Sequence, residues 1–138
     1  FGIVGVGDFG VMHIQALEQL PEAEVHADSC RTESRLKAIC EKYKIPNWYT
    51  NVDDLMNDPE MDVIIVATGE DTHYSFTEKA IREGKHVLLE KPICLNVEDG
   101  KKLLELEQNT DLYILPGHIL RYDASYNNAY RILQNVIY

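Results

Sequence analysis

The sequence predicts an α/β fold, in which a doubly wound parallel sheet of strand order 3-2-1-4-5-6 carries helices on both faces. Short apolar runs alternate with segments of helical spacing along the 138 residues. Asp62–Thr68 contains the run Val-Ile-Ile-Val-Ala, which is typical of a strand buried on both faces. A glycine-rich turn follows the first apolar run, and an amphipathic segment follows the turn. This alternation requires right-handed crossovers and therefore a parallel sheet.

The expected strands are short and apolar, and turn residues separate them from the helices. In chain order they are Phe1–Val6, Val25–Cys30, Trp48–Tyr49, Asp62–Thr68, His86–Glu90 and Tyr113–Leu115. Pro21 ends the first helix, whose apolar residues at helical spacing are Phe9, Met12, Ala16, Leu17 and Leu20. Thr32 is an N-cap candidate for the second helix, whose apolar face is Leu36, Ile39, Cys40 and Tyr43.

Four further helices are expected from caps and periodicity. Asn51 caps a brief helix that carries Leu55 and Met56, and Gly84 ends a helix at Tyr74–Arg82. Asn96 caps the next helix, which we expect to bury Val97, Leu103 and Leu104 and to expose Lys101, Glu105 and Glu107. The positions that mark the last helix are Tyr126, Ala129, Tyr130, Leu133 and Ile137.

Composition narrows the classes of partner and compartment. The net charge of −10 argues against nucleic acid and anionic membranes as partners, and no apolar run reaches transmembrane length. Cys30, Cys40 and Cys94 form no C-x-x-C pair, which indicates free thiols in the cytoplasm and no metal site. The sequence opens at Phe1 inside a strand, so we expect residues 1–138 to be one domain of a longer protein.

The glycines of the first turn have the spacing Gly5-x-Gly7-x-x-Gly10. Between a strand and a helix, this spacing is typical of dinucleotide binding. Gly5 permits the tight turn, Gly7 lets the backbone approach a pyrophosphate, and Gly10 lets the helix pack on the strand. The N–H groups near Asp8 and Phe9 then face the phosphates at the helix N-terminus.

The end of the second strand decides how the adenosine ribose is held. An acidic residue is expected about 20 positions after the glycines, but Cys30 stands there, while Asp28 lies on the same face and is a second candidate. Arg31 follows and favours a 2′-phosphate, and therefore NADP slightly over NAD. The alternative is that Arg31 only pairs with Glu33 in solvent.

Two more loops follow strands of the expected sheet. In the loop Thr68–His73, Thr68 and Gly69 are expected beside the middle of the cofactor, and His73 is a candidate for cofactor contact at the start of the next helix. Glu90-Lys91-Pro92 ends a buried strand near the expected nicotinamide position. There Lys91 can donate to a substrate oxygen or lose a proton if it is desolvated, and Pro92 fixes the turn, with a cis bond as one option. The other histidines of the first strands and helix, His13 and His26, are expected to be structural.

Taken together, these motifs make the sequence resemble the N-terminal domain of the glucose–fructose oxidoreductase/inositol 2-dehydrogenase (Gfo/Idh/MocA) family. The matching motifs, in order, are Gly5–Gly10, Thr68–His73, Gly84–Val87, Glu90-Lys91-Pro92 and His118-x-x-Arg121-Tyr122. The resemblance implies a dehydrogenase that catalyses the reversible NAD(P)-dependent oxidation of a secondary alcohol on a sugar, cyclitol or sugar derivative. It implies that Lys91 contacts nicotinamide ribose and substrate, that Glu90 and Pro92 shape that wall, and that Arg121 and Tyr122 lie near the substrate.

Two departures from the family pattern limit what this chain does alone. Cys30 replaces the usual acidic or small polar residue, which leaves the choice between NAD and NADP open. The family's C-terminal substrate domain is missing, so we expect cofactor binding with little turnover. If the protein forms a homo-oligomer, we expect the subunits to associate through that missing domain. The alternatives are a non-catalytic dinucleotide sensor or assembly module and a methyltransferase that uses S-adenosylmethionine. The absence of a G-x-x-x-x-G-K-[ST] loop argues against a kinase or nucleotide phosphatase.

Overall fold

A computed structural model describes residues 1–136, and it contains one six-stranded parallel sheet of order β3-β2-β1-β4-β5-β6. The predicted fold class and strand order are therefore confirmed. The strands are β1 (Gly2–Val4), β2 (Ala27–Ser29), β3 (Asn47–Tyr49), β4 (Val63–Val66), β5 (His86–Leu89) and β6 (Ile114–Pro116). β1, β2, β4 and β5 are shorter than their predicted ranges, whereas β3 begins one residue earlier than predicted and β6 is shifted by one residue.

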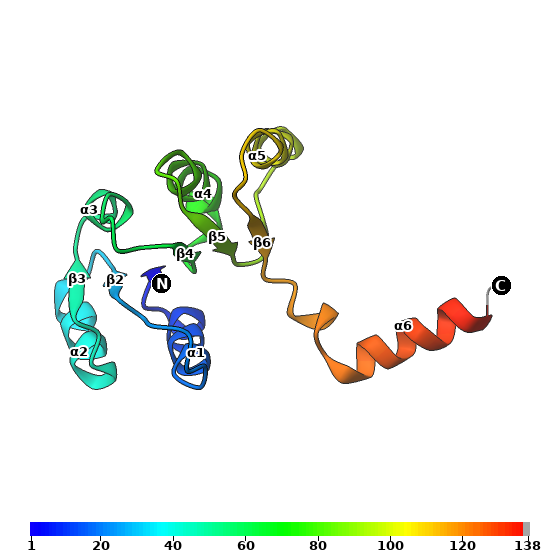
Figure 1. Cartoon of the computed structure of the whole chain (residues 1–138), viewed down its shortest axis with the longest axis horizontal. Helices are drawn as coiled ribbons and strands as arrows, with labels where there is room; N and C mark the ends of the chain where they lie inside the picture. The colour runs from blue at the N-terminus through cyan, green and yellow to red at the C-terminus, as the bar shows by residue number, and fades with distance from the viewer. Residues whose placement is uncertain (137–138) are drawn as a thin grey trace.

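The helices form two layers. Figure 1 shows α1 (Asp8–Leu17) and α2 (Glu33–Tyr43) on one face of the sheet, and α3 (Val52–Met56), α4 (His73–Arg82) and α5 (Val97–Gln108) on the other. Two single turns, η1 (Glu70–Thr72) and η2 (Ile119–Arg121), precede α4 and the last helix, α6 (Ala124–Val136). None of the helices in the described part of the chain has the length and apolar character that a membrane span needs.

The two cores follow from the alternation of side chains along the strands. Ile3 and Ile65 face α1 and α2, where they pack with residues such as Leu36. Their neighbours Val4 and Val66 face the opposite core, which α3, α4 and α5 cover. Because both faces are covered, the central strands read as continuous apolar runs in the sequence.

The first helix presents a different stripe to the sheet from the one that periodicity indicated. Phe9, Met12 and Leu20 are exposed, and the buried positions of α1 are Gly10, Ile14 and Leu17. A Cβ atom built on Gly10 would lie only 1.8 Å from the carbonyl oxygen of Gly5. This contact between backbones sets the rotation of α1, so Ile14, one turn after Gly10, enters the core.

The prediction for α5 was also partly wrong. Leu103 is buried, but Val97 and Leu104 are 72% and 53% exposed, because α5 packs on α4 through a narrow stripe that continues to Leu106. Glu107, expected to face water, accepts a hydrogen bond at 2.8 Å from the backbone N–H of Ile114. It thereby ties the end of α5 to the edge strand.

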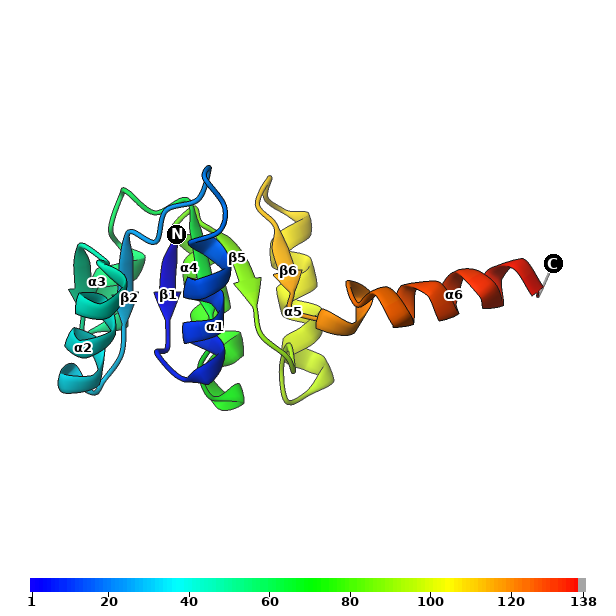
Figure 2. The same ribbon diagram turned by 90° about the horizontal axis from the view of Figure 1, so that it is seen from below.

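The last helix points away from the sheet, as both views show (Figures 1 and 2). Its predicted position is confirmed for residues 124–136, and Ile137 lies outside the described residues. The apolar side chains Tyr126, Tyr130 and Leu133 are 58%, 62% and 57% exposed. The helix therefore adds nothing to either core of the sheet.

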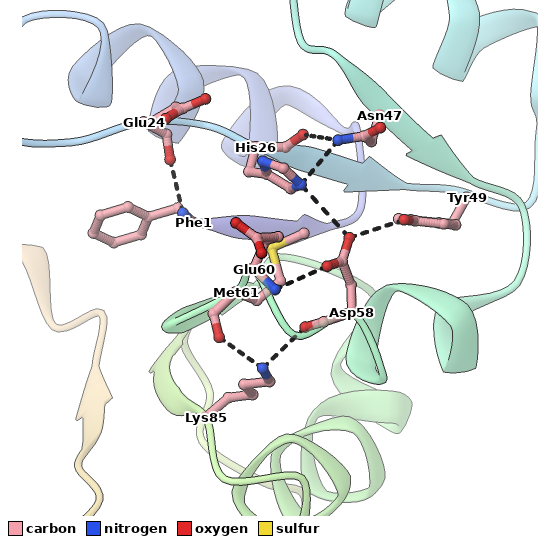
Figure 3. Close-up of polar contacts among 9 residues, drawn as sticks. All are labelled: Phe1, Glu24, His26, Asn47, Tyr49, Asp58, Glu60, Met61 and Lys85. Atoms are coloured by element: carbon pink, nitrogen blue, oxygen red, sulfur yellow. Dashed lines mark hydrogen bonds and ion pairs between the residues drawn. The ribbon is translucent and has the colours of Figure 1, made fainter.

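A polar network joins the strands at their amino ends (Figure 3). The Asp58 carboxylate accepts hydrogen bonds from the Tyr49 hydroxyl and the Glu60 N–H, both at 2.9 Å, and it lies 3.6 Å from His26 Nε2. Together with the ring, these bonds lower the pKa of Asp58, and the Glu60 N–H has the largest effect. The buried Lys85 ammonium donates to the carbonyls of Asp58 and Met61. His26 thus takes part in a structural network.

Candidate functional site

A cleft of about 680 Å³ lies at the carboxyl ends of β1, β2 and β4. The cleft lies where the direction of strand order reverses. The chain builds the sheet outward from β1 through β2 to β3, and then returns to the other side of β1 to add β4. From β1 the chain turns directly into α1 (Figure 2). In open α/β sheets this crevice is the position at which ligands bind. The walls come from the turn after β1, the end of β2 with the start of α2, and the loop after β4.

The glycine turn fits a pyrophosphate group. Gly5 has φ of +107° and faces the Ala67 carbonyl, whose oxygen a built Cβ atom would meet at 2.5 Å. Gly7 is the N-cap of α1, and a Cβ atom there would meet no described atom within 4 Å. Close backbone contacts thus require glycine at Gly5 and Gly10, while Gly7 leaves the cleft open where α1 begins. Unpaired N–H groups and the helix dipole favour an anion at this place.

At the end of β2, the cleft is lined by Cys30, Arg31, Thr32 and Arg35. The Cys30 sulfur accepts a hydrogen bond at 3.4 Å from the Thr32 N–H. Glu33, the alternative partner of Arg31, forms its ion pair with Lys37 at 2.7 Å. Arg35 was not among the predicted site residues, although its spacing of four residues from Arg31 was a usable signal.

Asp28 does not reach the cleft, so this candidate for ribose binding was wrong. The side chain is fully buried, since it points from the middle of β2 into the layer below α1 and α2. Its Oδ1 accepts from the Ser29 N–H at 2.8 Å, and Oδ2 has no partner among the described residues. Burial raises the pKa of Asp28 to about 8. The carboxyl group is therefore protonated at neutral pH.

The loop after β4 is held by its own side chains. The hydroxyls of Thr68 and Thr72 are 2.7 Å apart, and that of Thr72 donates to the Gly69 carbonyl at 2.8 Å. His73 is 1% exposed, and its Nδ1 and Nε2 lie 2.6 Å and 3.2 Å from the carbonyl oxygens of Pro92 and Thr68. The ring therefore ties this loop to the Lys91–Pro92 turn, and cofactor contact by His73 stays a prediction.

A second cavity, of about 310 Å³, contains Lys91. It shares Ala67, Thr68 and Gly69 with the larger cleft, so the two meet at the end of β4. The Lys91 ammonium lies 4.5 Å from the centre of the Phe9 ring, within range of a cation–π interaction. The Lys91–Pro92 bond is cis. The glycine turn and Lys91 thus face adjoining parts of one crevice.

Glu90 is buried behind Lys91. One carboxylate oxygen lies 2.9 Å from His13 Nε2, and the other accepts from the Lys91 N–H at 3.1 Å. Gly117 packs against the same carboxylate, since a built Cβ atom would lie 3.3 Å from it. The partnership between His13 and Glu90 links α1 to the Lys91 turn. No local pattern could have revealed it, because 77 positions separate the two residues.

Arg121 and Tyr122, expected near the substrate, are exposed at η2. Neither lines the two cavities, and their proximity to substrate stays a prediction. The same holds for Pro92, which is exposed in the turn after Lys91. Within residues 1–136, no three side chains of His, Cys, Asp or Glu are arranged to hold a metal ion.

Comparisons with known proteins agree with this geometry. A family model described as "Oxidoreductase family, NAD-binding Rossmann fold" (GFO_IDH_MocA) matches residues 1–118. The chain is 28% identical over 97% of its length to myo-inositol 2-dehydrogenase of Thermotoga maritima and covers 40% of that protein. It is 30% identical to inositol 2-dehydrogenase of Salmonella typhimurium, of which it covers 41%. The chain thus spans about two fifths of the length of these curated relatives.

Solved structures show the same similarity. A probable dehydrogenase from Thermotoga maritima superposes with a TM-score of 0.92 at 28% identity, over 97% of this chain and 40% of that one. Scyllo-inositol dehydrogenase from Lactobacillus casei, solved with bound NAD(H) and scyllo-inositol, gives 0.90 at 25% identity over the same shares. Biliverdin reductase from Synechocystis, solved with biliverdin and NADP+, gives 0.87 at 25% identity over 96% and 42%.

Proposed function

This chain belongs to the Gfo/Idh/MocA oxidoreductase family, with its NAD-binding Rossmann fold, and we propose that it is the cofactor-binding part of an NAD(P)-dependent dehydrogenase. Residues 1–138 would form the dinucleotide-binding domain of a longer two-domain enzyme. The observation that carries this proposal is the crevice in which an open glycine turn adjoins a cavity containing Lys91.

The proposed binding mode assigns one part of the cofactor to each wall. The amides after Gly7 hold the pyrophosphate, and Asp8 and Phe9 lie in the first turn of that helix. The backbone at Thr68 and Gly69 supports the middle of the cofactor, and the Glu90-Lys91-Pro92 turn supports the nicotinamide half. When bound, the nicotinamide ring supplies a site that accepts or donates a hydride.

Lys91 is the catalytic residue that we propose. Oxidation of a secondary alcohol needs a group that takes the hydroxyl proton, and reduction needs a group that returns it. The Lys91 Nζ can hold that proton or donate a hydrogen bond to the substrate oxygen. Glu90 would position the turn, because its carboxylate accepts the Lys91 N–H and contacts His13.

The proposed substrate is a sugar, cyclitol or sugar derivative that carries a secondary alcohol. The support is that relatives of about 25–30% identity are inositol dehydrogenases. The cofactor is NAD or NADP with a lean toward NADP, because Cys30 stands where a carboxylate would bind the ribose hydroxyls. Arg121 and Tyr122 would lie on the substrate side, beyond the cavities of this domain.

Binding is tested by thermal unfolding of the 138-residue chain with NADH or NADPH at millimolar concentration. We expect a rise in Tm, because a ligand that binds only the folded state stabilises it. If neither dinucleotide raises Tm, the proposed function is wrong.

The role of Lys91 is tested by Lys91→Ala in the full-length enzyme. We expect kcat to fall by about a hundredfold or more, as for loss of an acid–base group, with cofactor affinity little changed. Turnover at the wild-type rate would exclude the catalytic role.

A further inference from the structure

We propose that Phe9 and His13 are positioning residues, which keep the Lys91 ammonium free to meet a substrate oxygen. The Phe9 ring supports the ammonium, and His13 holds the neighbouring Glu90 carboxylate so that it does not capture Lys91. The inference rests on the proposed function, because it assigns to two side chains of α1 the placement of the proposed catalytic group.

Phe9 and His13 project from the same side of α1, since residues four apart lie one above the other on a helix. Phe9 is in the first turn, directly before Gly10. The close contact of Gly10 with the Gly5 carbonyl fixes the rotation of α1 and thereby directs both side chains toward the turn after β5. The helix whose N-terminus would hold the pyrophosphate thus also contacts the first two residues of that turn.

The Lys91 ammonium lies against an aromatic face and not against a carboxylate. Its Nζ is 4.5 Å from the centre of the Phe9 ring, and over residues 1–136 it forms no ion pair or hydrogen bond. Phe9 and Lys91 both line the smaller cavity, where Phe9 is 41% exposed. A cation–π contact attracts an ammonium without neutralising its charge or occupying its three donors. The Nζ therefore stays able to donate to a ligand.

The Glu90 carboxylate is the obvious ion-pair partner of Lys91, yet both of its oxygens are engaged elsewhere. One lies 2.9 Å from His13 Nε2, and the other accepts the backbone N–H of Lys91 at 3.1 Å. A carboxylate only accepts hydrogen bonds, so the His13 ring donates from Nε2. Glu90 is 5% exposed, and a buried carboxylate that loses its partner is costly. Without the His13 donor, Glu90 would therefore turn to the ammonium of its neighbour in sequence.

The contact between Phe9 and Lys91 is tested in the 138-residue chain without any cofactor. Reductive methylation places isotope-labelled methyl groups on the lysine amines and keeps their positive charge, and Lys91→Arg identifies the Lys91 signal in the NMR spectrum by its loss. We expect the ring current of Phe9 to shift this signal upfield, and Phe9→Leu should return it to the position of exposed lysines. A Lys91 signal that is the same in wild type and Phe9→Leu would overturn the inference.

The role of Phe9 in turnover is tested in the full-length enzyme. Phe9→Leu removes the aromatic face, so kcat should fall about two- to fivefold while affinity for the dinucleotide changes by less than about twofold. Phe9→Tyr keeps an aromatic ring and should have a clearly higher kcat than Phe9→Leu. Met12→Leu is the control, since Met12 is an exposed residue of α1 that lines neither cavity, and it should follow the wild type. Equal kcat in the two Phe9 variants would contradict the role of the ring.

His13 is tested with a pair of substitutions that act in opposite directions. In His13→Leu the freed Glu90 pairs with the Lys91 ammonium, so kcat should fall about tenfold or more. Adding Glu90→Gln removes the capturing charge, and kcat should then rise at least about threefold above that of His13→Leu. If His13 only supported the fold, a second substitution at the same contact would not restore activity. No recovery in the double variant would therefore overturn the role of His13.

Further measurements separate the possible failures. Circular dichroism checks that each variant is folded, and if His13→Leu does not fold, the Phe9 variants and the Lys91 signal still decide the inference. Where NADH or NADPH raises Tm but the Lys91 signal does not respond to Phe9→Leu, the inference is wrong and the proposed function stands. If neither dinucleotide raises Tm, the proposed function is wrong, and the inference fails with it.

Discussion

Replacing Asp28 with asparagine should make the stability of the protein less dependent on pH. The carboxyl group has a pKa of about 8 in the folded state against an ordinary value of 3.8. Between these values it is protonated when folded and ionised when unfolded. The unfolded state therefore binds fewer protons, and stability falls as pH rises from about 4 to about 8, beyond which both states are ionised.

The size of the effect follows from that interval. Each pH unit between the two pKa values removes about 1.4 kcal/mol, so ionisation of Asp28 in the unfolded state costs about 4 kcal/mol of stability at pH 7 and about 1 to 2 kcal/mol at pH 5. Asp28→Asn keeps an acceptor for the Ser29 N–H but cannot ionise. An unpaired amide group costs about 1–3 kcal/mol at every pH, so this offset cancels when two pH values are compared.

The assay is urea unfolding of both proteins at pH 5, 6 and 7. The stability of Asp28→Asn relative to the wild type should rise by about 3 kcal/mol from pH 5 to pH 7. Asp111→Asn, which alters an exposed carboxylate between α5 and β6, is the control and should follow the wild type. A difference between Asp28→Asn and wild type that stays constant over this range would refute the assignment of a protonated Asp28.

Two other substitutions test the walls of the crevice. Gly10→Ala should lower stability by about 2 kcal/mol or more in urea unfolding, because its Cβ atom would collide with the Gly5 carbonyl. Gly7→Ala should leave stability within about 1 kcal/mol and weaken dinucleotide binding, since its methyl group enters open space; equal loss of stability in both would contradict the geometry. His73→Phe should destabilise the protein by about 1–3 kcal/mol, because it removes the ring nitrogens that lie at hydrogen-bond distance from the Pro92 and Thr68 carbonyls. Unchanged stability would show that the ring does not hold the loop.

Local patterns were sufficient for the architecture and for much of the site. The glycine spacing, the caps Asn51 and Asn96, and the run in β4 each depend on neighbours in sequence, and all lie where they were expected. The strand order was predictable as well, because right-handed crossovers between alternating strands and helices allow few topologies. The location of the crevice, at the carboxyl ends of these strands, could therefore be predicted from the sequence.

The errors arose where contacts between distant segments decide the outcome. The rotation of α1 depends on one backbone contact at Gly10, which apolar periodicity does not encode. Asp28 was a candidate for ribose binding because an acidic residue is expected near the end of the second strand, yet its side chain is buried in the core. The partnership of His13 with Glu90 joins two elements that only the assembled sheet brings together.

The Asp58–Lys85 network (Figure 3) lies at the amino ends of the strands, opposite the crevice at their carboxyl ends. Its bonds join the segments that enter β2, β3, β4 and β5, with Asp58 at its centre and the buried Lys85 ammonium at one side. The carboxyl ends of the strands run into the loops that surround the crevice, and the bonds that hold those loops involve the side chains of Thr72 and His73. The loops around the crevice are therefore expected to open locally while the amino ends of the strands stay fixed. Amide protons beside Lys85 should accordingly exchange with solvent more slowly than those of the loop after β4.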